Sequence, residues 1–281
     1  MKHYIQILVQ LSMFTFILTS LFGAGLGLTI KEVIEPLKRI KLVLLVLIAN
    51  FLLIPAIAYA LSVLLKVDPG LHAGLIIIAC CAGAPFLPKL ITTAKGNVAY
   101  SIGIMVLLMA VTVVFLPIAL PLIIPGLSVN PLGIAKPLVL FMLLPLGLGL
   151  LVKAGISNLA ALIKPFIMKI SSFSLIIAGI FALLADYKIF TAAWGTGVYN
   201  AMALLTILAL LIGSIFGLIS QSEKSVMTLG SGARNIAAAL IIAATNFSDP
   251  RVTTVVLIGS LVQFIILFLL AFCLGKYAPA R

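Results

Sequence analysis

Runs of hydrophobic residues alternate with short polar connections along the whole chain. Each run is about as long as the ~20 residues that an α-helix needs to cross a bilayer. The runs lie at about residues 5–29, 42–65, 71–95, 98–124, 137–156, 165–186, 197–219, 226–247 and 252–275. This pattern predicts an all-α polytopic membrane protein with about nine transmembrane helices, in which residues 1–281 form a single transmembrane domain.

The amino-acid composition is that of a membrane protein. Of the 281 residues, 64% are hydrophobic and 9% are charged, and the mean hydropathy is +1.37. In soluble proteins roughly a quarter of the residues are charged. The net charge of +12 comes from basic residues in the short connections, as the positive-inside rule produces. The expected partner is therefore the lipid bilayer and not a nucleic acid.

The basic residues also predict an orientation. With nine spans, the two termini lie on opposite sides of the membrane. If the amino terminus is outside, the inner connections hold eleven Lys and Arg residues and the outer ones five, with Lys89 and Arg234 left inside the membrane. This asymmetry predicts a multi-pass protein of the inner (plasma) membrane with a cytoplasmic carboxy terminus.

Two of the runs are interrupted near the middle, where glycine or proline disfavours a regular helix. The residues expected to break the helices are Gly83, Pro85 and Pro88 in the third run and Gly230 and Gly232 in the eighth. Each break is followed by a cation, Lys89 in the third run and Arg234 in the eighth. We therefore expect two helices that unwind within the membrane.

The positions of the two breaks indicate an internal repeat. The first repeat is placed at about residues 5–124 and the second at about 137–275, with the fifth run as a spacer. The broken run then stands third in each set of four. An offset of five spans gives the repeats opposite topology, and paired broken helices at matching positions point to the binding site of a transporter.

The two cations predict the chemistry of that site. No acidic residue is placed to pair with Lys89 or Arg234 at mid-membrane depth, and a charge there costs from ~2.5 to ~10 kcal/mol or more. The simplest compensating anion is a substrate. The residues expected to bind it are Arg234, Asn235, Ser231, Lys89, Asn50, Thr92 and Thr93. Alternatively, the cations snorkel or donate to carbonyls freed by the breaks, and the threonines bond within their own helix.

Other kinds of site are not indicated. Cys80, Cys81 and Cys273 lie in apolar runs without ligand spacing, so neither a metal site nor a disulfide framework is expected. No Asp, Glu or His lies near the centre of a run, which argues against an intramembrane enzyme. An anion channel would need a pore lined by several helices, whereas the polarity is concentrated at two breaks.

Four segments together resemble the bile acid:sodium symporter family of secondary transporters. They are Gly25-Leu26-Gly27-Leu28-Thr29, Asn50-Phe51 followed by Pro55-Ala56, Ala94-Lys95-Gly96-Asn97-Val98-Ala99-Tyr100-Ser101, and Gly232-Ala233-Arg234-Asn235. The resemblance implies ten helices in two inverted repeats, arranged as a core and a panel domain, with two unwound helices crossing in the core. Nine runs imply that the first helix is missing here, with a panel of runs 5–29, 137–156 and 165–186 and a core of the remainder.

The sodium ligands implied by the resemblance carry over only in part. Where the family pattern has a glutamate and a glutamine, this chain has Gly230 and Arg234. Where the pattern has a serine-asparagine pair, it has Leu87-Pro88. The candidates for a residual ion site are Asn50, Ser101 and Asn235. Because an added cation repels sodium, our hypothesis is that Arg234, with or without Lys89, takes the electrostatic place of the bound ion.

The expected function is transport of a small organic anion by alternating access, without the two-sodium site, without a cofactor and without catalysis. Uniport, exchange and proton-linked transport through a titrating Lys89 all fit. One alternative is a sodium-coupled symporter with a divergent ion site, and another is a membrane sensor or scaffold that does not transport. The sequence leaves open the substrate, the direction of transport, the coupling ion (sodium, a proton or none) and the oligomeric state.

Overall fold

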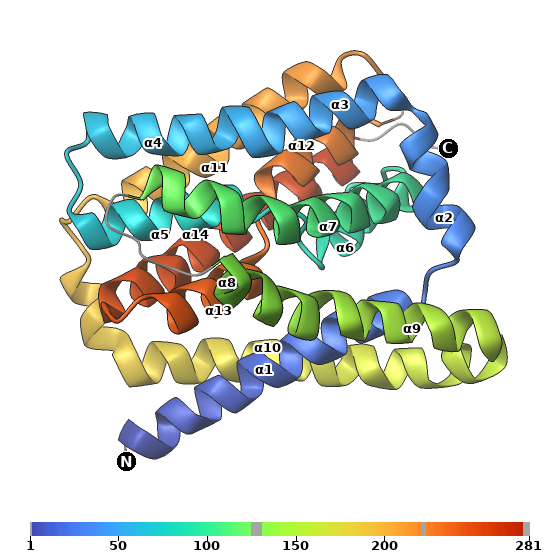
Figure 1. Ribbon diagram of the computed structural model, residues 1–281, viewed down its shortest axis with the longest axis horizontal. Coiled ribbons are helices and arrows are strands. Elements are labelled where there is room, and N and C mark those ends of the chain that lie inside the picture. Colours follow the sequence, from blue (N-terminus) through green and yellow to red (C-terminus); the bar gives the residue numbers. More distant parts are fainter. Residues whose placement is uncertain (1, 125–130, 221–222, 278–281) are drawn as a thin grey trace. The chain divides into compact units, whose positions relative to one another are not determined.

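The computed structural model describes residues 2–124, 131–220 and 223–277 (Figure 1). Its elements, all helical, are α1 (Lys2–Gly25), α2 (Ile30–Ile34), η1 (Glu35–Lys38), α3 (Ile40–Ile48), η2 (Ala49–Leu53), α4 (Ile54–Leu64), α5 (Pro69–Cys80), α6 (Leu87–Thr93), α7 (Val98–Ile123), α8 (Pro131–Leu138), η3 (Val139–Leu143), α9 (Leu144–Gly155), α10 (Ser157–Ala192), α11 (Val198–Gly217), α12 (Lys224–Gly232), α13 (Ile236–Asn246) and α14 (Pro250–Lys276). The prediction of an all-α protein is confirmed.

Several of these helices are long and apolar enough to cross a membrane. Within the described ranges there are five, at Ile40–Leu64, Val98–Ile123, Pro131–Gly155, Val198–Gly217 and Arg251–Lys276, and a bent pair at Gln10–Gly25 and Ile30–Lys38 would make a sixth. The shorter apolar helices α5 and α13 each end or begin at a break, which divides their hydrophobic run in two. The polytopic character is thus confirmed, and the number nine stays a prediction.

Prolines change the winding of two spans. Pro55 and Pro145 each follow one turn of π-helix, η2 and η3 respectively. Because proline donates no hydrogen bond, the helix loses one backbone bond, and the wider π-turn is the local adjustment. In η2 this turn holds Asn50, which is 0% exposed.

The chain divides into two compact units, each described by itself. Unit 1 takes in the residues up to Ile30 and Lys136–Trp194, the runs that the resemblance assigns to a panel. In it α1 packs against α9 and α10, and Figure 1 shows α1 running obliquely across them. At the crossing of α1 with α9, a Cβ added to Gly25 would lie 2.9 Å from the Cα of Gly149. Glycine lets these two backbones approach closely.

Unit 2 takes in Lys31–Ala135 and the residues from Gly195 onward. Its two broken helices are α5 with α6 and α12 with α13. Helix α5 packs against α4, α7, α13 and α14, and α12 packs against α6, α7, α11 and α14. Intact helices therefore surround both breaks. The assignment of the two units to panel and core stays a prediction.

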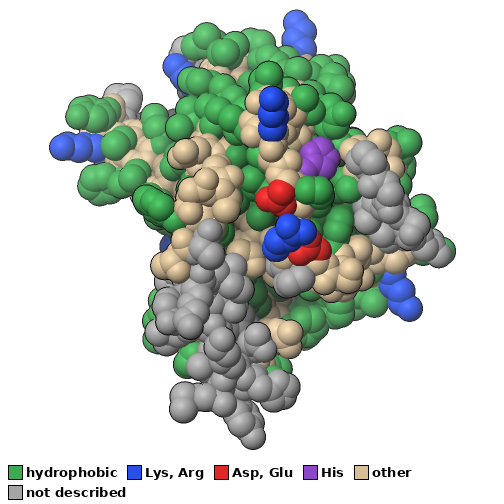
Figure 2. Space-filling view, turned by 90° about the vertical axis from the view of Figure 1, so that its left-hand side faces the viewer, with side chains coloured by type: hydrophobic (Ala, Val, Ile, Leu, Met, Phe, Trp, Pro, Cys, Tyr) green, Lys and Arg blue, Asp and Glu red, His purple; other side chains and the backbone are tan. Residues whose placement is uncertain are grey.

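At one end of unit 2, two helix caps share an arginine. Asp68 caps α5 and Asp249 caps α14 through backbone N–H groups. Arg251 pairs with Asp249 at 2.7 Å and with Asp68 at 3.6 Å, and His72 Nδ1 lies 2.8 Å from Ser62 Oγ. Figure 2 shows acidic and basic side chains beside a histidine on an otherwise largely hydrophobic face. These ionic side chains lie in or beside the connections between helices.

Candidate functional site

The two breaks meet in unit 2. Helix α5 ends at Cys80 and α6 begins at Leu87, while α12 ends at Gly232 and α13 begins at Ile236. Between them, Ala82 and Arg234 form an antiparallel bridge, and the N–H of Asn235 donates to the carbonyl oxygen of Cys81 at 2.8 Å. The unwound segments thus satisfy one another's backbone groups where a membrane offers no water.

The first break has the cause that its sequence suggests. Gly83 has a φ of +82°, in the left-handed region that favours glycine, and a Cβ there would lie 2.5 Å from the backbone nitrogen of Met109. Pro85 lies in the unwound stretch. Pro88 lies in the first turn of α6, where a missing N–H costs nothing.

The second break begins later than its glycines suggest. Gly230 and Gly232 both lie inside α12, and the backbone leaves the helix at Ala233, with φ −79° and ψ 107°. A Cβ on Gly232 would lie 2.6 Å from a methyl carbon of Leu210 on α11. Gly232 therefore allows α12 and α11 to pack closely and is not itself unwound.

Two intact helices hold the bridge from outside. On α7, Thr112 Oγ1 accepts from the N–H of Ala82 at 3.2 Å and donates to its carbonyl oxygen at 3.1 Å. On α14, Gln263 Oε1 accepts from the N–H of Arg234 at 3.1 Å, and Nε2 donates to its carbonyl oxygen at 3.3 Å. Each bridging residue thus has both backbone groups bonded by one side chain. Sequence reasoning did not single out Thr112, which is one hydroxyl within an apolar run.

Arg234 is 3% exposed, and its guanidinium bonds to oxygens of this protein. Nη1 donates to the carbonyl oxygen of Ala79 at 3.3 Å, and Nη2 donates to Asn50 Oδ1 and to the carbonyl oxygen of Ser231. Asn50 Nδ2 in turn donates to the carbonyl oxygen of Val46 at 2.9 Å. Ala79 and Ser231 lie in the last turns of α5 and α12, where free carbonyls favour a cation. Three elements thus form an oxygen cage around one charge.

Three other site residues are buried beside these helices. Asn235 is fully buried, and its Oδ1 accepts from the N–H of Ala238 at 3.1 Å, which caps α13. Ser101 is also fully buried and donates to the carbonyl oxygen of Val98 at 2.6 Å. Ser231 Oγ is buried and makes no hydrogen bond within the described part of the chain. The structure therefore brings Asn50, Ser231 and Asn235 to Arg234 or its bridge.

The remaining site residues lie on α6 and are exposed. Thr92 Oγ1 donates to the carbonyl oxygen of Pro88 at 2.9 Å, and Thr93 Oγ1 donates to that of Lys89 at 3.1 Å. This is the bonding within the same helix that the sequence analysis gave as the alternative. Lys89 is not among the hydrogen-bond partners of Arg234. The two cations thus differ, because Arg234 is caged and Lys89 is accessible.

The oxygens at the crossing are the type that binds a hard cation such as sodium. Asn50 Oδ1 and the carbonyl oxygens of Ala79 and Ser231 already bond to the guanidinium. They therefore fit an arginine in this structure. Within the described residues, no group of three or more His, Cys, Asp or Glu could hold a metal ion.

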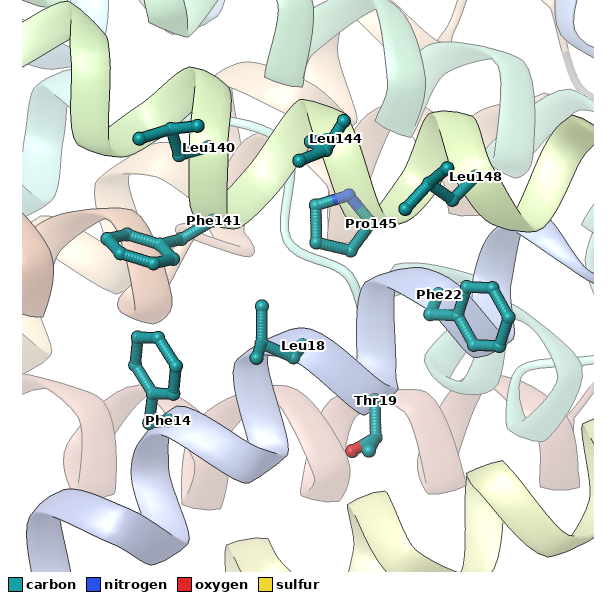
Figure 3. Close-up of a pocket in the computed structure, with 9 residues that line it drawn as sticks. All are labelled: Phe14, Leu18, Thr19, Phe22, Leu140, Phe141, Leu144, Pro145 and Leu148. Atoms are coloured by element: carbon teal, nitrogen blue, oxygen red, sulfur yellow. The ribbon is translucent and has the colours of Figure 1, made fainter.

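Unit 1 contains an apolar cavity of about 470 Å³ along α1, η3 and α9 (Figure 3). It is lined by Phe14, Leu18, Thr19, Phe22, Leu140, Phe141, Leu144, Pro145 and Leu148. The rings of Phe14 and Phe141 face each other edge to face at 4.8 Å. The hydroxyl of Thr19 already donates to the carbonyl oxygen of Thr15 at 2.6 Å. This cavity suits hydrocarbon and has no cation for an anionic group.

The chain is similar to proteins that are named as sodium-dependent transporters or cotransporters. It is 27% identical over 138 residues to the uncharacterized sodium-dependent transporter YocS of Bacillus subtilis, covering 47% of this chain and 42% of that protein. It is 27% identical over 175 residues to the probable sodium/metabolite cotransporter BASS1, chloroplastic, of Arabidopsis thaliana, covering 60% of this chain and 41% of that protein. The chain thus spans less than half the length of either relative.

A family model gives the broader assignment. Residues 14–192 match the Sodium Bile acid symporter family. The match includes the first broken helix and ends before the second, so the oxygen cage around Arg234 lies partly outside it. Because the matched residues make up more than half of the chain, this protein belongs to the Sodium Bile acid symporter family.

Proposed function

We propose that this protein carries a small organic anion across the membrane by alternating access and does not need sodium to do so. The observation that supports the proposal is the bonding of Arg234 to Asn50 Oδ1 and to the carbonyl oxygens of Ala79 and Ser231. These oxygens could serve a bound cation, and a cation that belongs to the chain engages them. Arginine keeps its charge at physiological pH, so the positive charge stays throughout the cycle.

Electrostatics favours an anion over sodium at this place. Two unit charges 4 Å apart interact by about 4 kcal/mol at an effective dielectric constant of 20. A sodium ion beside the guanidinium would be disfavoured by roughly that amount, and an anionic group would be favoured. Arg234 is enclosed, so it acts on the anion through its field. Lys89, Thr92 and Thr93 on the exposed side of α6 are the proposed direct contacts.

The test is flux in proteoliposomes. We would measure counterflow and uptake of radiolabelled succinate, gluconate and toluenesulfonate, each with and without an inward sodium gradient. We expect saturable counterflow of at least one probe, at a rate that sodium does not change. Uptake that requires sodium would contradict the proposal, and binding without flux would indicate a sensor or scaffold.

Variants test the role of Arg234. Arg234→Gln should reduce the affinity for the transported probe, because the fixed positive charge is gone. Arg234→Gln combined with Gly230→Glu should create a response to sodium, because a carboxylate replaces the cation. Arg251→Gln is the matched control, since Arg251 is an exposed arginine of the same unit. Unchanged affinity in Arg234→Gln would eliminate the proposed role.

A sodium-coupled symporter is the second candidate, because the names of both relatives include sodium. In that case the guanidinium would have to leave Asn50 and expose the oxygen cage during the cycle. Sodium-driven accumulation by the unaltered protein would favour this candidate.

A further inference from the structure

A buried carboxylate lies at the amino end of α12, outside the oxygen cage. Glu223 is 1% exposed, although it belongs to a connection between hydrophobic runs. Its Oε1 accepts from Arg39 Nη1 at 2.7 Å and from Asn97 Nδ2 at 3.0 Å. Arg39 follows η1, Asn97 caps α7 and Glu223 directly precedes α12. Three separate segments of unit 2 thus meet at one acidic side chain.

The groups around this carboxylate are mostly basic. The centre of the Tyr100 ring on α7 lies 5.8 Å from the guanidinium carbon of Arg39. The backbone N–H of Tyr100 donates to Asn97 Oδ1 at 3.0 Å. From α11, Gly217 packs against Lys224, the residue that follows Glu223. The other charged residues at the nearby ends of α6 and α14 are Lys95 and Lys276. Among these groups, Glu223 alone is acidic.

Arg39 and Asn97, which both donate to Glu223, differ in how firmly they are held. A carboxylate this deep needs a cation beside it to stay ionised. The side chain of Arg39 is 53% exposed, so it can turn away into solvent. The amide of Asn97 is held by its bond to α7 and can donate to a carboxylate or to a neutral carboxylic acid. The contact with Arg39 can therefore open while the bond from Asn97 persists.

Helix α12 connects Glu223 to the crossing of the two unwound segments at Ala82 and Arg234. Its carbonyl oxygen accepts from the N–H of Met227 at 2.9 Å, as in the first turn of α12. Gly230 lies seven residues later, almost two turns along the same helix and thus on nearly the same face. The same helix ends one residue before the unwound segment that carries Arg234. Movement of α12 would therefore change the contact between Glu223 and Arg39.

We propose that Glu223 is the proton-coupling site of the carrier. It takes up one proton when Arg39 withdraws, becoming a neutral acid, and releases that proton when Arg39 returns. The O–H bond of the acid is the only covalent bond that forms and breaks. The inference rests on the proposed transport function, in which Arg234 supplies the fixed charge and Glu223 the exchangeable one.

The experiment measures counterflow and proton-driven accumulation separately. Proteoliposomes of the full chain and of Glu223→Gln would be assayed with the same three probes for counterflow at equal pH and for accumulation driven by a pH gradient. We expect Glu223→Gln to retain counterflow and to lose the accumulation that the proton gradient drives. A merely structural role would impair both. Glu35→Gln is the control, because Glu35 is exposed in η1, the helix that directly precedes Arg39. This variant should keep both activities.

Each other outcome is decisive. Accumulation that persists in Glu223→Gln would overturn the inference, as would counterflow in the unaltered protein that no proton gradient can drive uphill. Absence of all counterflow in the unaltered protein would instead refute the proposed function. If Glu223→Gln fails to fold, Glu223→Asp retains the carboxyl group, and its coupled accumulation should show a shifted pH profile. An unshifted profile in that variant would overturn the inference.

Discussion

Two helix crossings, one in each unit, solve the same packing problem with opposite chemistry. In unit 1, α1 meets α9 through close backbone contacts at Gly25 and Gly149. In unit 2, the segments at Ala82 and Arg234 cross with the side chains of Thr112 and Gln263 bonded to them. Intact helices satisfy their own backbone groups, so the first crossing needs only close approach. Unwound helices leave those groups free, so the second needs polar partners.

Each unit also has a cation close to the end of a helix. Lys164 Nζ in unit 1 occupies the space where a Cβ of Gly27 would be, just past the end of α1. Arg234 in unit 2 bonds to carbonyls in the last turns of α5 and α12. Both charges lie where a helix dipole favours a cation. Lys164 is only partly buried and Arg234 almost fully, so the loss of a partner should matter much more at Arg234.

The largest effect is expected from Asn50→Leu. The substitution removes the side-chain acceptor of Arg234 Nη2, and a hydrogen bond to a charged group contributes about 1.5–3 kcal/mol. We expect the free energy of unfolding to fall by about 2–3 kcal/mol, measured as a lower unfolding temperature in detergent.

Thr206→Val is the matched control for this variant. Thr206 is a buried polar residue of unit 2 whose hydroxyl donates only within its own helix, to the carbonyl oxygen of Met202 at 2.8 Å. Thr206→Val should lower the free energy of unfolding much less than Asn50→Leu does. Equal losses in the two variants would show that the cage around Arg234 has no special contribution to stability.

The apolar crossing predicts opposite signs for two neighbouring glycines. A Cβ on Gly149 would lie 2.3 Å from the carbonyl oxygen of Phe22, whereas Gly147 has nothing within 4 Å. Gly149→Ala should therefore destabilise the protein by about 1–3 kcal/mol, because backbone must move. Gly147→Ala should stabilise it by about 0.4–1 kcal/mol, because it restricts the unfolded chain. Unfolding temperatures that fall together would contradict the close-approach account.

These cases show which features the sequence predicts. The hydrophobic runs predict the helices, because burial and helix length depend on local composition. Gly83 and Pro85 predict the first break, because their backbone restrictions act locally. Gly230 and Gly232 suggest unwinding, yet both stay helical. The second break starts at Ala233, where the bond to Cys81, the bridge to Ala82 and the bonds to Gln263 are long-range and leave no local signal.

The same distinction explains the polar residues. Arg234 is conspicuous in an apolar run, so the sequence alone singles it out. Its partners could not, because Ala79 and Ser231 contribute backbone oxygens that any residue would have. Glu223 lies in a connection, where solvent is expected. Its burial depends on Arg39 and Asn97, which are 184 and 126 residues away along the chain.

The smallest predicted effect compares a helix cap at the crossing with one at the surface. Asn235 caps α13 with an amide, which does not titrate, and Asp249 caps α14 with a carboxylate. Hydrogen bonds from the side chain and the backbone N–H of Arg251 hold the pKa of Asp249 below its usual value of 3.8. The stability from this cap is therefore present above that value and is lost as the pH falls through the lower folded pKa.

Asp249→Asn isolates the charge, because asparagine is about as good a helix cap as aspartate. The unaltered protein should exceed the variant in stability by at most about 1 kcal/mol above pH 5, since exposed ion pairs contribute little. That difference should shrink towards zero as the pH falls below 3.8. Unfolding temperatures of both proteins, measured from pH 6 to pH 3, check this, and carboxyl groups common to both cancel. A difference that does not depend on pH would mean that Asp249 acts through cap geometry alone, as Asn235 does at the crossing.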